Sequence, residues 1–227
     1  MIVAVSGGKG GVGKSTIARN VGRALDAVVI DADLARPALP VETEPTLNDV
    51  LQGRARPIDA VEEIGSIRFV PSGDTLTTDR RAQIARLPKA VEAIEDQYGR
   101  VVLDCAAGID RDVGFCLYCA DACILVTVPE QPAMVDLLRT KGLVDDVETP
   151  VVALVVNRCG PETPEPLVER LGQKLGVEPV TVPTTTDIEE ANAAGRAVTE
   201  QFPDSPIVDS FIYVANRVTR YEERPTP

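Results

Sequence analysis

Short apolar runs rich in Val, Ile and Leu alternate along the chain with longer segments of helical periodicity. The expected strands are residues 2–5, 27–30, 67–70, 101–103, 123–128, 151–156 and 179–182. Most are apolar on both faces, which is typical of a parallel sheet covered by helices on each side. The expected helices are residues 14–25, 79–98, 111–120, 131–147, 165–175, 187–194 and 206–220. This alternation predicts an α/β fold with a doubly wound, mostly parallel sheet and right-handed crossovers.

The domain organisation follows from the length of the chain and the absence of linkers. The 227 residues suffice for one sizeable domain, and the sequence has no repeat and only a short Pro-rich stretch at 160–166. We therefore expect one domain over residues 1–221 and a short frayed tail over 222–227. The chain has no run of about 18 apolar residues, and its apolar start ends at Ser6 without a basic segment before it. These features predict a cytoplasmic protein.

The formal charge is −12, with 35 acidic residues against 23 basic ones. Such a protein lacks the positive footprint that nucleic acid requires, so we expect no nucleic-acid partner. Two interpretations of the acidity remain open: adaptation to the salty cytoplasm of a halophilic cell, and a binding face for a basic partner. The first is favoured because the acidic residues are scattered and form no block.

One glycine-rich loop links the first expected strand to the first expected helix. It fits G-x-x-x-x-G-K-[ST] with the residues Gly8, Lys9, Gly10, Gly11, Val12, Gly13, Lys14 and Ser15, and Thr16 follows. Glycines let backbone N–H groups turn toward phosphates, and the helix N-terminus adds the positive end of its dipole. Lys14 is expected to reach the β- and γ-phosphates of ATP, and Ser15 to bind Mg²⁺. The full pattern in this context argues against a glycine-rich turn without a ligand.

The loop also carries a second Lys. The run GGKGGVGKST resembles the deviant Walker A motif of the MinD/ParA family of P-loop ATPases, whose signature is an extra Lys near the start of the loop. The resemblance implies that Lys9 reaches across an ATP-bound homodimer to the nucleotide of the partner. Only five residues of the chain are Lys, and two of them lie in this loop. That concentration favours a phosphate-binding role for Lys9 over a solvated loop position.

Carboxylates follow two further expected strands. Asp31 and Asp33 lie just past a strand end, where open α/β sheets bind ligands. Their segment resembles the switch I of the family, which implies that Asp33 positions the attacking water and that Asp31 lies in the shell of Mg²⁺ or the nucleophile. The segment DCAAGI resembles switch II and implies that Asp104 holds Mg²⁺ through a water, although Ala106 stands where the family usually has Pro. Capping of a helix or turn is the alternative for Asp31 and Asp33.

Two late segments resemble the part of the family's site that receives the base. Asn157 and Arg158 lie in a V-x-N-R segment, where the resemblance implies that the Asn amide reads the adenine edge with its donor and acceptor. A turn-forming Asn is the alternative. The segment VPTTTDIEEANAAGRAV resembles a late segment of the family, which implies that Pro183 lies at the rim beside the base, although Thr184 and Thr185 stand where an acidic residue is expected.

The C-terminal part lacks the basic amphipathic helix with which MinD-type proteins usually grip membranes. The expected last helix carries on one face the apolar residues Ile207, Val208, Phe211, Ile212 and Val218. That spacing suits packing on the domain. Its only cations are Arg217 and Arg220, which is too few for a stable membrane anchor.

The cysteines suggest a rival function. Cys116 and Cys119 have C-x-x-C spacing, which places both thiols on one face of a helix. Nickel chaperones related to the family bind metal through paired Cys at their dimer interface, so a homodimer here could assemble a tetrahedral metal site. The alternative, which we favour, is that Cys116, Cys119 and Cys123 fill a contact between a helix and a strand.

The resemblance extends over residues 1–218 and predicts a MinD-like molecular switch. Mg²⁺ and ATP are the expected cofactors, hydrolysis is expected to be slow, and the ATP-bound form is expected to be a homodimer that recruits an unidentified partner protein as a spatial or positioning regulator. A metallocentre-assembly ATPase that uses Cys116 and Cys119 is the alternative function.

Overall fold

The computed structural model describes residues 1–34, 44–73 and 83–224. Its eight strands are β1 (Ile2–Ser6), β2 (Val28–Asp31), β3 (Glu62–Ile64), β4 (Ile67–Val70), β5 (Val101–Asp104), β6 (Ala122–Thr127), β7 (Val151–Cys159) and β8 (Pro179–Pro183). They form one sheet in the order β3-β4-β2-β5-β1-β6-β7-β8, in which only the β3–β4 pairing is antiparallel. The predicted doubly wound, mostly parallel sheet is confirmed.

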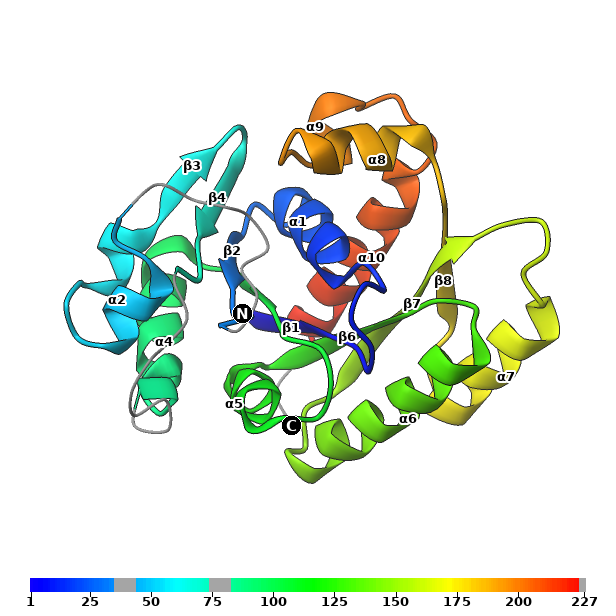
Figure 1. The fold of residues 1–227 in the computed structure, drawn as a ribbon, viewed down its shortest axis with the longest axis horizontal. Helices are drawn as coiled ribbons and strands as arrows, with labels where there is room; N and C mark the ends of the chain where they lie inside the picture. The colour runs from blue at the N-terminus through cyan, green and yellow to red at the C-terminus, as the bar shows by residue number, and fades with distance from the viewer. Residues whose placement is uncertain (35–43, 74–82, 225–227) are drawn as a thin grey trace.

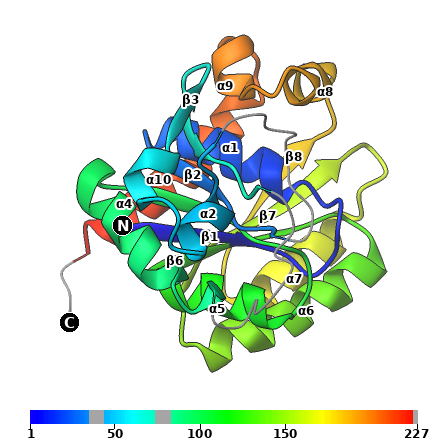
Figure 2. The ribbon, with the colours of Figure 1, turned by 60° about the vertical axis from the view of Figure 1, so that its left-hand side comes forward.

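The helices lie on both faces of this sheet (Figures 1 and 2). They are α1 (Lys14–Ala24), α2 (Leu47–Leu51), the 3-10 helix η1 (Pro57–Ala60), α4 (Leu87–Tyr98), α5 (Arg111–Cys119), α6 (Gln131–Asp146), α7 (Glu165–Leu175), α8 (Thr186–Ala193), α9 (Val198–Gln201) and α10 (Val208–Glu222). One core packs α1, α8, α9 and α10 against the sheet, and a second core packs α4, α5, α6 and α7 against the other face. The central strands are therefore buried on both sides, as their uniformly apolar sequences require.

The parallel register brings the carboxyl ends of three neighbouring strands together. Asp31 at the end of β2 is the register partner of Asp104 at the end of β5, and β5 pairs with β1, after which the P-loop follows. Ligands of open α/β sheets bind at this edge. The strand order thus places the predicted phosphate loop beside both predicted Mg²⁺ carboxylates.

Some predicted boundaries were wrong. The short strand β3 was missed because its sequence Glu62–Ile64 is acidic and too short to show a period. The single helix expected over 79–98 is interrupted, since α4 begins at Leu87 with Pro88 in its first turn, where a residue without an N–H fits. The part of that prediction over 79–82 lies outside the described residues.

The C-terminal helix also differs from expectation. Helix α10 runs to Glu222, one residue into the expected tail, while residues 225–227 lie outside the described chain. Phe211 and Val218 are buried against the sheet, as expected, but Ile212 is 42% exposed and does not belong to the packed face. Of the helices in the described ranges, none has the length and apolar character needed to cross a bilayer.

Phe211 should contribute most to the docking of α10, because it is the largest fully buried side chain of the helix, while its neighbour Ile212 is exposed. We expect Phe211→Ala to lower the free energy of unfolding by about 3–5 kcal/mol, through lost burial and the cavity left behind. Ile212→Ala is the matched control and should change stability by only about 0.5 kcal/mol. Urea denaturation measures both values, and equal effects of the two substitutions would contradict this packing of α10.

Candidate functional site

The P-loop occupies the turn between β1 and α1, as the sequence predicted. Gly13 is the residue before α1 and has a φ of 98°, in the left-handed region that favours glycine. A Cβ on Gly13 would lie 2.1 Å from Asn157 Nδ2, and one on Gly8 would lie 2.2 Å from the carbonyl carbon of Asp136. Gly10 and Gly11 differ, since a Cβ on either would meet no described atom within 4 Å. The loop is therefore tightly held at both ends and open in its middle.

Lys14 and Ser15 begin α1 and face the end of β5. Lys14 is buried, with 8% of its surface exposed, and Ser15 forms a side-chain hydrogen bond with Asp104. Burial raises the pKa of Asp104 to about 7, and the neighbouring Asp31 carboxylate adds to the rise, while Ser15 and the positive charge of Lys14 act in the opposite direction. The structure thus brings together Lys14, Ser15, Asp31 and Asp104.

Asp31 is held in place by two hydrogen bonds. Its Oδ1 accepts from the backbone N–H of Asp33 at 3.1 Å, and its Oδ2 accepts from Ser72 Oγ at 2.9 Å. Asp31 is 1% exposed, whereas Asp33 is only half-buried, at the start of the loop that follows β2. The two acids therefore have different surroundings, although they are two residues apart. Sequence reasoning missed Ser72, which follows β4 at the same edge of the sheet.

Arg19 is a second residue that sequence reasoning missed. It lies on α1 one turn beyond Ser15 and is 6% exposed. Its charge acts on both Asp104 and Asp31, while burial lowers the pKa of its own guanidinium. Its spacing of four residues from Ser15 was the available signal, because residues i and i+4 share a helix face. Arg19 adds a second cation, beside Lys14, to a site with two buried carboxylates.

The residues expected near the base lie around the end of β7. Asn157 is 5% exposed, and its Nδ2 donates to the backbone oxygen of Val12 at 2.8 Å. In this structure the amide therefore supports the P-loop, and its contact with adenine stays a prediction. Arg158 is exposed with a φ of 58°, at an irregularity where β7 shifts register against β8. Pro183 is exposed at the end of β8, beside Cys159 in that register.

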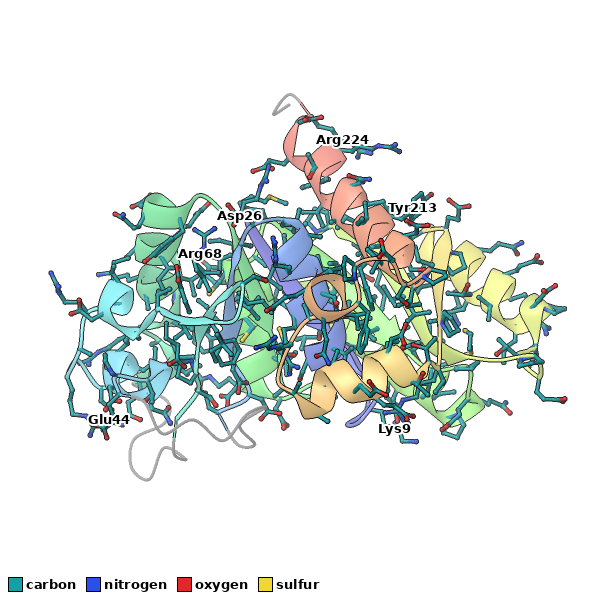
Figure 3. The ribbon with its side chains drawn as sticks, turned by 90° about the horizontal axis from the view of Figure 1, so that it is seen from above. Lys9, Asp26, Glu44, Arg68, Tyr213 and Arg224 are labelled. Atoms are coloured by element: carbon teal, nitrogen blue, oxygen red, sulfur yellow. The ribbon has the colours of Figure 1, made fainter. Side chains whose placement is uncertain are left out.

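Lys9 lies apart from this buried group. Figure 3 shows its side chain at the edge of the molecule, below α8, and its Nζ forms an ion pair with Glu130 Oε2 at 3.2 Å. Both partners are exposed, so the pair stabilises the protein little. Thr16, in the first turn of α1, donates from Oγ1 to Asn192 Oδ1 of α8 at 3.2 Å. Sequence reasoning did not foresee Glu130 or Asn192 as partners of the loop.

The cysteines fill the contact between α5 and the sheet, as we favoured. Cys105, Cys116 and Cys123 belong to the core between the sheet and the layer of α4, α5, α6 and α7. Cys119 packs against the same core. A hydrogen bond with Cys105 and burial raise the pKa of the Cys116 thiol, and burial raises that of Cys119 to about 12. Across the described residues, no three side chains of the metal-binding types gather at one point.

A phosphate-binding loop at the carboxyl edge of a parallel sheet, beside buried carboxylates on neighbouring strands, defines a P-loop NTPase. The sequence matches the ParA family, described as an NUBPL iron-transfer P-loop NTPase, over residues 1–219. The chain therefore belongs to the ParA family of P-loop NTPases, and the resemblance found in the sequence is confirmed.

Relatives agree with this assignment, and a solved structure agrees with the fold. An uncharacterised ATP-binding protein from Methanocaldococcus jannaschii is 32% identical over 97% of this chain and 89% of its own length. The septum site-determining protein MinD of Synechocystis sp. is 29% identical over 79% of this chain and 70% of its own. The structure of MinD from Pyrococcus horikoshii, complexed with Mg-ADP, superposes with a TM-score of 0.84 over 98% of this chain and 97% of that one, at 24% identity.

The raised pKa of Asp104 predicts a stability that depends on pH. Between about pH 4 and pH 7 the folded protein holds a proton that the unfolded chain has released, so Asp104 lowers the stability progressively as pH rises through this window. Asp104→Asn removes this cost. In nucleotide-free protein without Mg²⁺, we expect the variant to exceed the wild type in free energy of unfolding by roughly 2–4 kcal/mol at pH 8 and to show little gain at pH 4.

Urea denaturation at both pH values tests this expectation. Asp59→Asn is the control, because Asp59 is exposed and its hydrogen bond with Arg56 lowers the pKa of the carboxyl. The control should show no gain at pH 8. An Asp104→Asn protein no more stable than the wild type at pH 8 would show that Asp104 carries no burial cost.

Proposed function

We propose that this protein binds Mg-ATP and hydrolyses it slowly, as a switch that closes into a homodimer and recruits a partner protein. The observation that carries the proposal is the convergence of Lys14, Ser15, Asp31 and Asp104 beneath the P-loop, with Lys9 at its exposed tip. The proposal includes a cytoplasmic location, without a nucleic-acid partner or a stable membrane anchor.

The loop suits the phosphates of ATP. Gly10 and Gly11 leave open space where side chains would stand, so the backbone between the two fixed ends can approach a ligand closely. Lys14 places its ammonium at the buried end of the same loop, where water competes little with a phosphate oxygen. A relative from Methanocaldococcus jannaschii is named an ATP-binding protein, and the Pyrococcus horikoshii MinD structure contains Mg-ADP. Thr16 and the base-side residues Asn157, Arg158 and Pro183 complete the proposed nucleotide site.

The carboxylate end of the site suits Mg²⁺. Asp104 Oδ1 is buried and has no hydrogen-bond partner among the described residues, which is unusual for a carboxylate oxygen and leaves a ligand position free. Ser15 contacts the same carboxylate, and Asp31 is its neighbour in the sheet. Hydroxyl and carboxylate oxygens are the donors that Mg²⁺ prefers, usually with several waters retained. When bound, Mg²⁺ would neutralise charge on the phosphates and favour the ionised form of Asp104.

Hydrolysis needs positioning and charge compensation more than covalent chemistry. We assign Asp33 to the orientation of the attacking water, because it lies beside Asp31 yet is only half-buried and can meet solvent. Lys14 compensates the charge that develops on the transferred phosphoryl group, and Lys9 of the partner subunit adds a second cation only after dimer closure. Hydrolysis would therefore be slow until the dimer closes, which is the behaviour expected of a molecular switch.

In this proposal Lys9 couples nucleotide binding to dimer formation. Its side chain is 46% exposed and is held by a surface ion pair with Glu130 that costs little to break. An exposed cation at the outer end of the loop can reach a second subunit, which the buried Lys14 cannot do. Closure over two nucleotides would present a new composite surface, and a partner protein that recognises it would be recruited only in the ATP state.

A metallocentre-assembly function is the alternative, and the description of the family mentions iron transfer. No specific contact favours it here. Cys116 is 1% exposed and shares a hydrogen bond with Cys105 inside the core, so the Cys116 and Cys119 pair is not presented to a second subunit. The raised thiol pKa values also disfavour the thiolate form that binds metal.

Lys14→Ala should weaken ATP binding by roughly two orders of magnitude, because it leaves phosphate charge uncompensated in a buried site. Titration with a fluorescent ATP analogue measures the affinity. Lys174→Ala on the exposed face of α7 is the control, since it removes the same charge far from the loop and should leave the affinity unchanged. Equal affinity in the Lys14 variant and the wild type would refute the assignment of the phosphate site.

Lys9→Ala should separate ATP binding from dimer closure. The variant should still bind ATP through Lys14 and the loop, but its dimer dissociation constant should rise roughly tenfold or more, because a phosphate charge loses its partner in the closed interface. Light scattering with ATP at several salt concentrations measures this, in an Asp33→Ala background that prevents turnover. Salt matters because it also screens repulsion between two acidic subunits.

Glu130→Gln is the matched control for Lys9→Ala. It breaks the same surface ion pair but leaves the ammonium of Lys9 in place, so this variant should dimerise at least as well as its parent. If the Lys9 variant dimerises with ATP like its parent at every salt concentration, Lys9 does not act across the interface and the sandwich dimer loses its basis.

A further inference from the structure

A second cavity lies at the opposite end of the molecule from the P-loop. It has a volume of about 410 Å³, within the range of small-molecule sites, and lies between the start of β7, the turn after α7 and the end of α10. Figure 3 shows Arg224, which lines this cavity, at the far side of the molecule from Lys9. The cavity is therefore separate from the nucleotide site.

The lining of this cavity is basic in a strongly acidic protein. Arg217, Arg220 and Arg224 contribute three guanidinium groups, and Glu178 contributes the one carboxylate. Arg217 and Arg220 are three residues apart in the last turns of α10, a spacing that places them on one helix face. Against a net charge of −12, a local surplus of two positive charges is a marked departure from the rest of the chain.

The three arginines have different roles. Arg217 is 15% exposed and donates to the backbone oxygen of Glu178 at 2.6 Å and to its Oε2 at 2.8 Å, so it neutralises this carboxylate and fixes the wall. Arg220 and Arg224 are exposed, and neither forms an ion pair with any residue in the described ranges. The guanidinium of Arg224 stacks over the ring of Tyr221, with its carbon 5.7 Å from the ring centroid. Two guanidinium groups thus remain available to an anion.

The opposite wall leaves room for such a ligand. Gly176 ends α7 in a left-handed conformation with a φ of 67°, and a Cβ there would meet no described atom within 4 Å. A further cavity of about 320 Å³ shares Pro150, Val151, Gly176 and Val177 with the first. Its own lining includes the ion pair of Lys141 with Asp145, and also Glu148. A basic lobe therefore continues into a lobe of mixed charge.

We propose that this cavity binds a small phosphate-bearing molecule, with the phosphate at Arg220 and Arg224 and the polar body of the molecule toward the neighbouring lobe. Guanidinium groups match phosphate through several charge-assisted N–H···O bonds at once. Phosphate is favoured over a single carboxylate because its oxygens point in several directions and can meet two guanidinium groups that come from different turns of the backbone. The protein would then have two separate ligand sites, one for this molecule and one for the nucleotide at the other end of the sheet.

Inorganic pyrophosphate is the probe, because it carries the phosphate chemistry without a nucleoside. Calorimetric titration is performed on the full chain with Lys14→Ala, which weakens phosphate binding at the P-loop, in a buffer low in chloride. Adding Arg220→Gln and Arg224→Gln should raise the dissociation constant roughly tenfold or more. Both side chains are exposed, so the fold should remain intact, which circular dichroism checks.

Arg54→Gln with Arg56→Gln is the matched control, since these arginines are also exposed and lie elsewhere, and their replacement changes the net charge equally. The control should bind pyrophosphate like its Lys14→Ala parent. Equal weakening in both double variants would show attraction by net charge alone and would overturn the proposal. The absence of pyrophosphate binding to the Lys14→Ala protein would overturn it as well.

A lipid headgroup offers the same phosphate chemistry as a soluble ligand. Co-sedimentation with phosphatidylglycerol vesicles distinguishes the two sources, and we expect the protein to stay in the supernatant because its net charge is repelled by anionic lipid. Sedimentation that is lost with Arg220→Gln and Arg224→Gln, without pyrophosphate binding in solution, would assign the cavity to a membrane and overturn the soluble ligand.

Discussion

Two carboxylates lie side by side at the ends of adjacent strands, and the rest of the site is arranged around them. The parallel register of β2 and β5 makes Asp31 and Asp104 neighbours, and both are almost completely buried. The desolvation and mutual repulsion of two buried carboxylates lower the free energy of unfolding, unless nearby cations or bound protons compensate the charge. Lys14 and Arg19 supply positive charge from α1, and burial raises the pKa of Asp104 to about 7. The fold therefore accepts a local cost that a bound divalent cation would relieve.

The P-loop is fixed by parts of the chain that are distant in sequence. Asn157 supports it from the end of β7, and the backbone of Asp136 lies directly against Gly8. Backbone packing on both sides orients Lys14 without the need for a ligand, which is the preorganisation that phosphoryl transfer requires. Lys9 lies outside this packing, with only a weak surface pair to Glu130. One loop thus combines a tightly packed part with an exposed cation.

Two groups of basic residues lie at opposite ends of the sheet. Lys14 and Arg19 act at the carboxyl edge, and Arg217, Arg220 and Arg224 surround the cavity at the other end. Helix α10 packs on α1 through the shared core, which provides a physical connection between the two ends.

The sequence alone determined the features that depend on neighbours along the chain. The alternation of apolar runs and helical segments predicted the sheet and most of its helices, because burial on both faces leaves a continuous apolar pattern. The loop with Lys9 and Lys14 was recognisable because a strand, a glycine-rich turn and a helix follow one another directly. The division of the long helix expected over 79–98 also has a local cause, since Pro88 lies in the first turn of α4.

The tertiary structure decided what depends on contacts between distant segments. Ile212 fits the apolar period of α10 yet is exposed, because the sheet determines which side of a helix is covered. Asn157 contacts a residue 145 positions away, and the hydrogen bond of Ser72 with Asp31 joins the ends of two neighbouring strands, β4 and β2. The basic cavity unites the ends of α7 and α10 with the start of β7. Periodicity records whether a side chain is apolar, but only the folded chain determines which residues meet, because strand order and register bring them together.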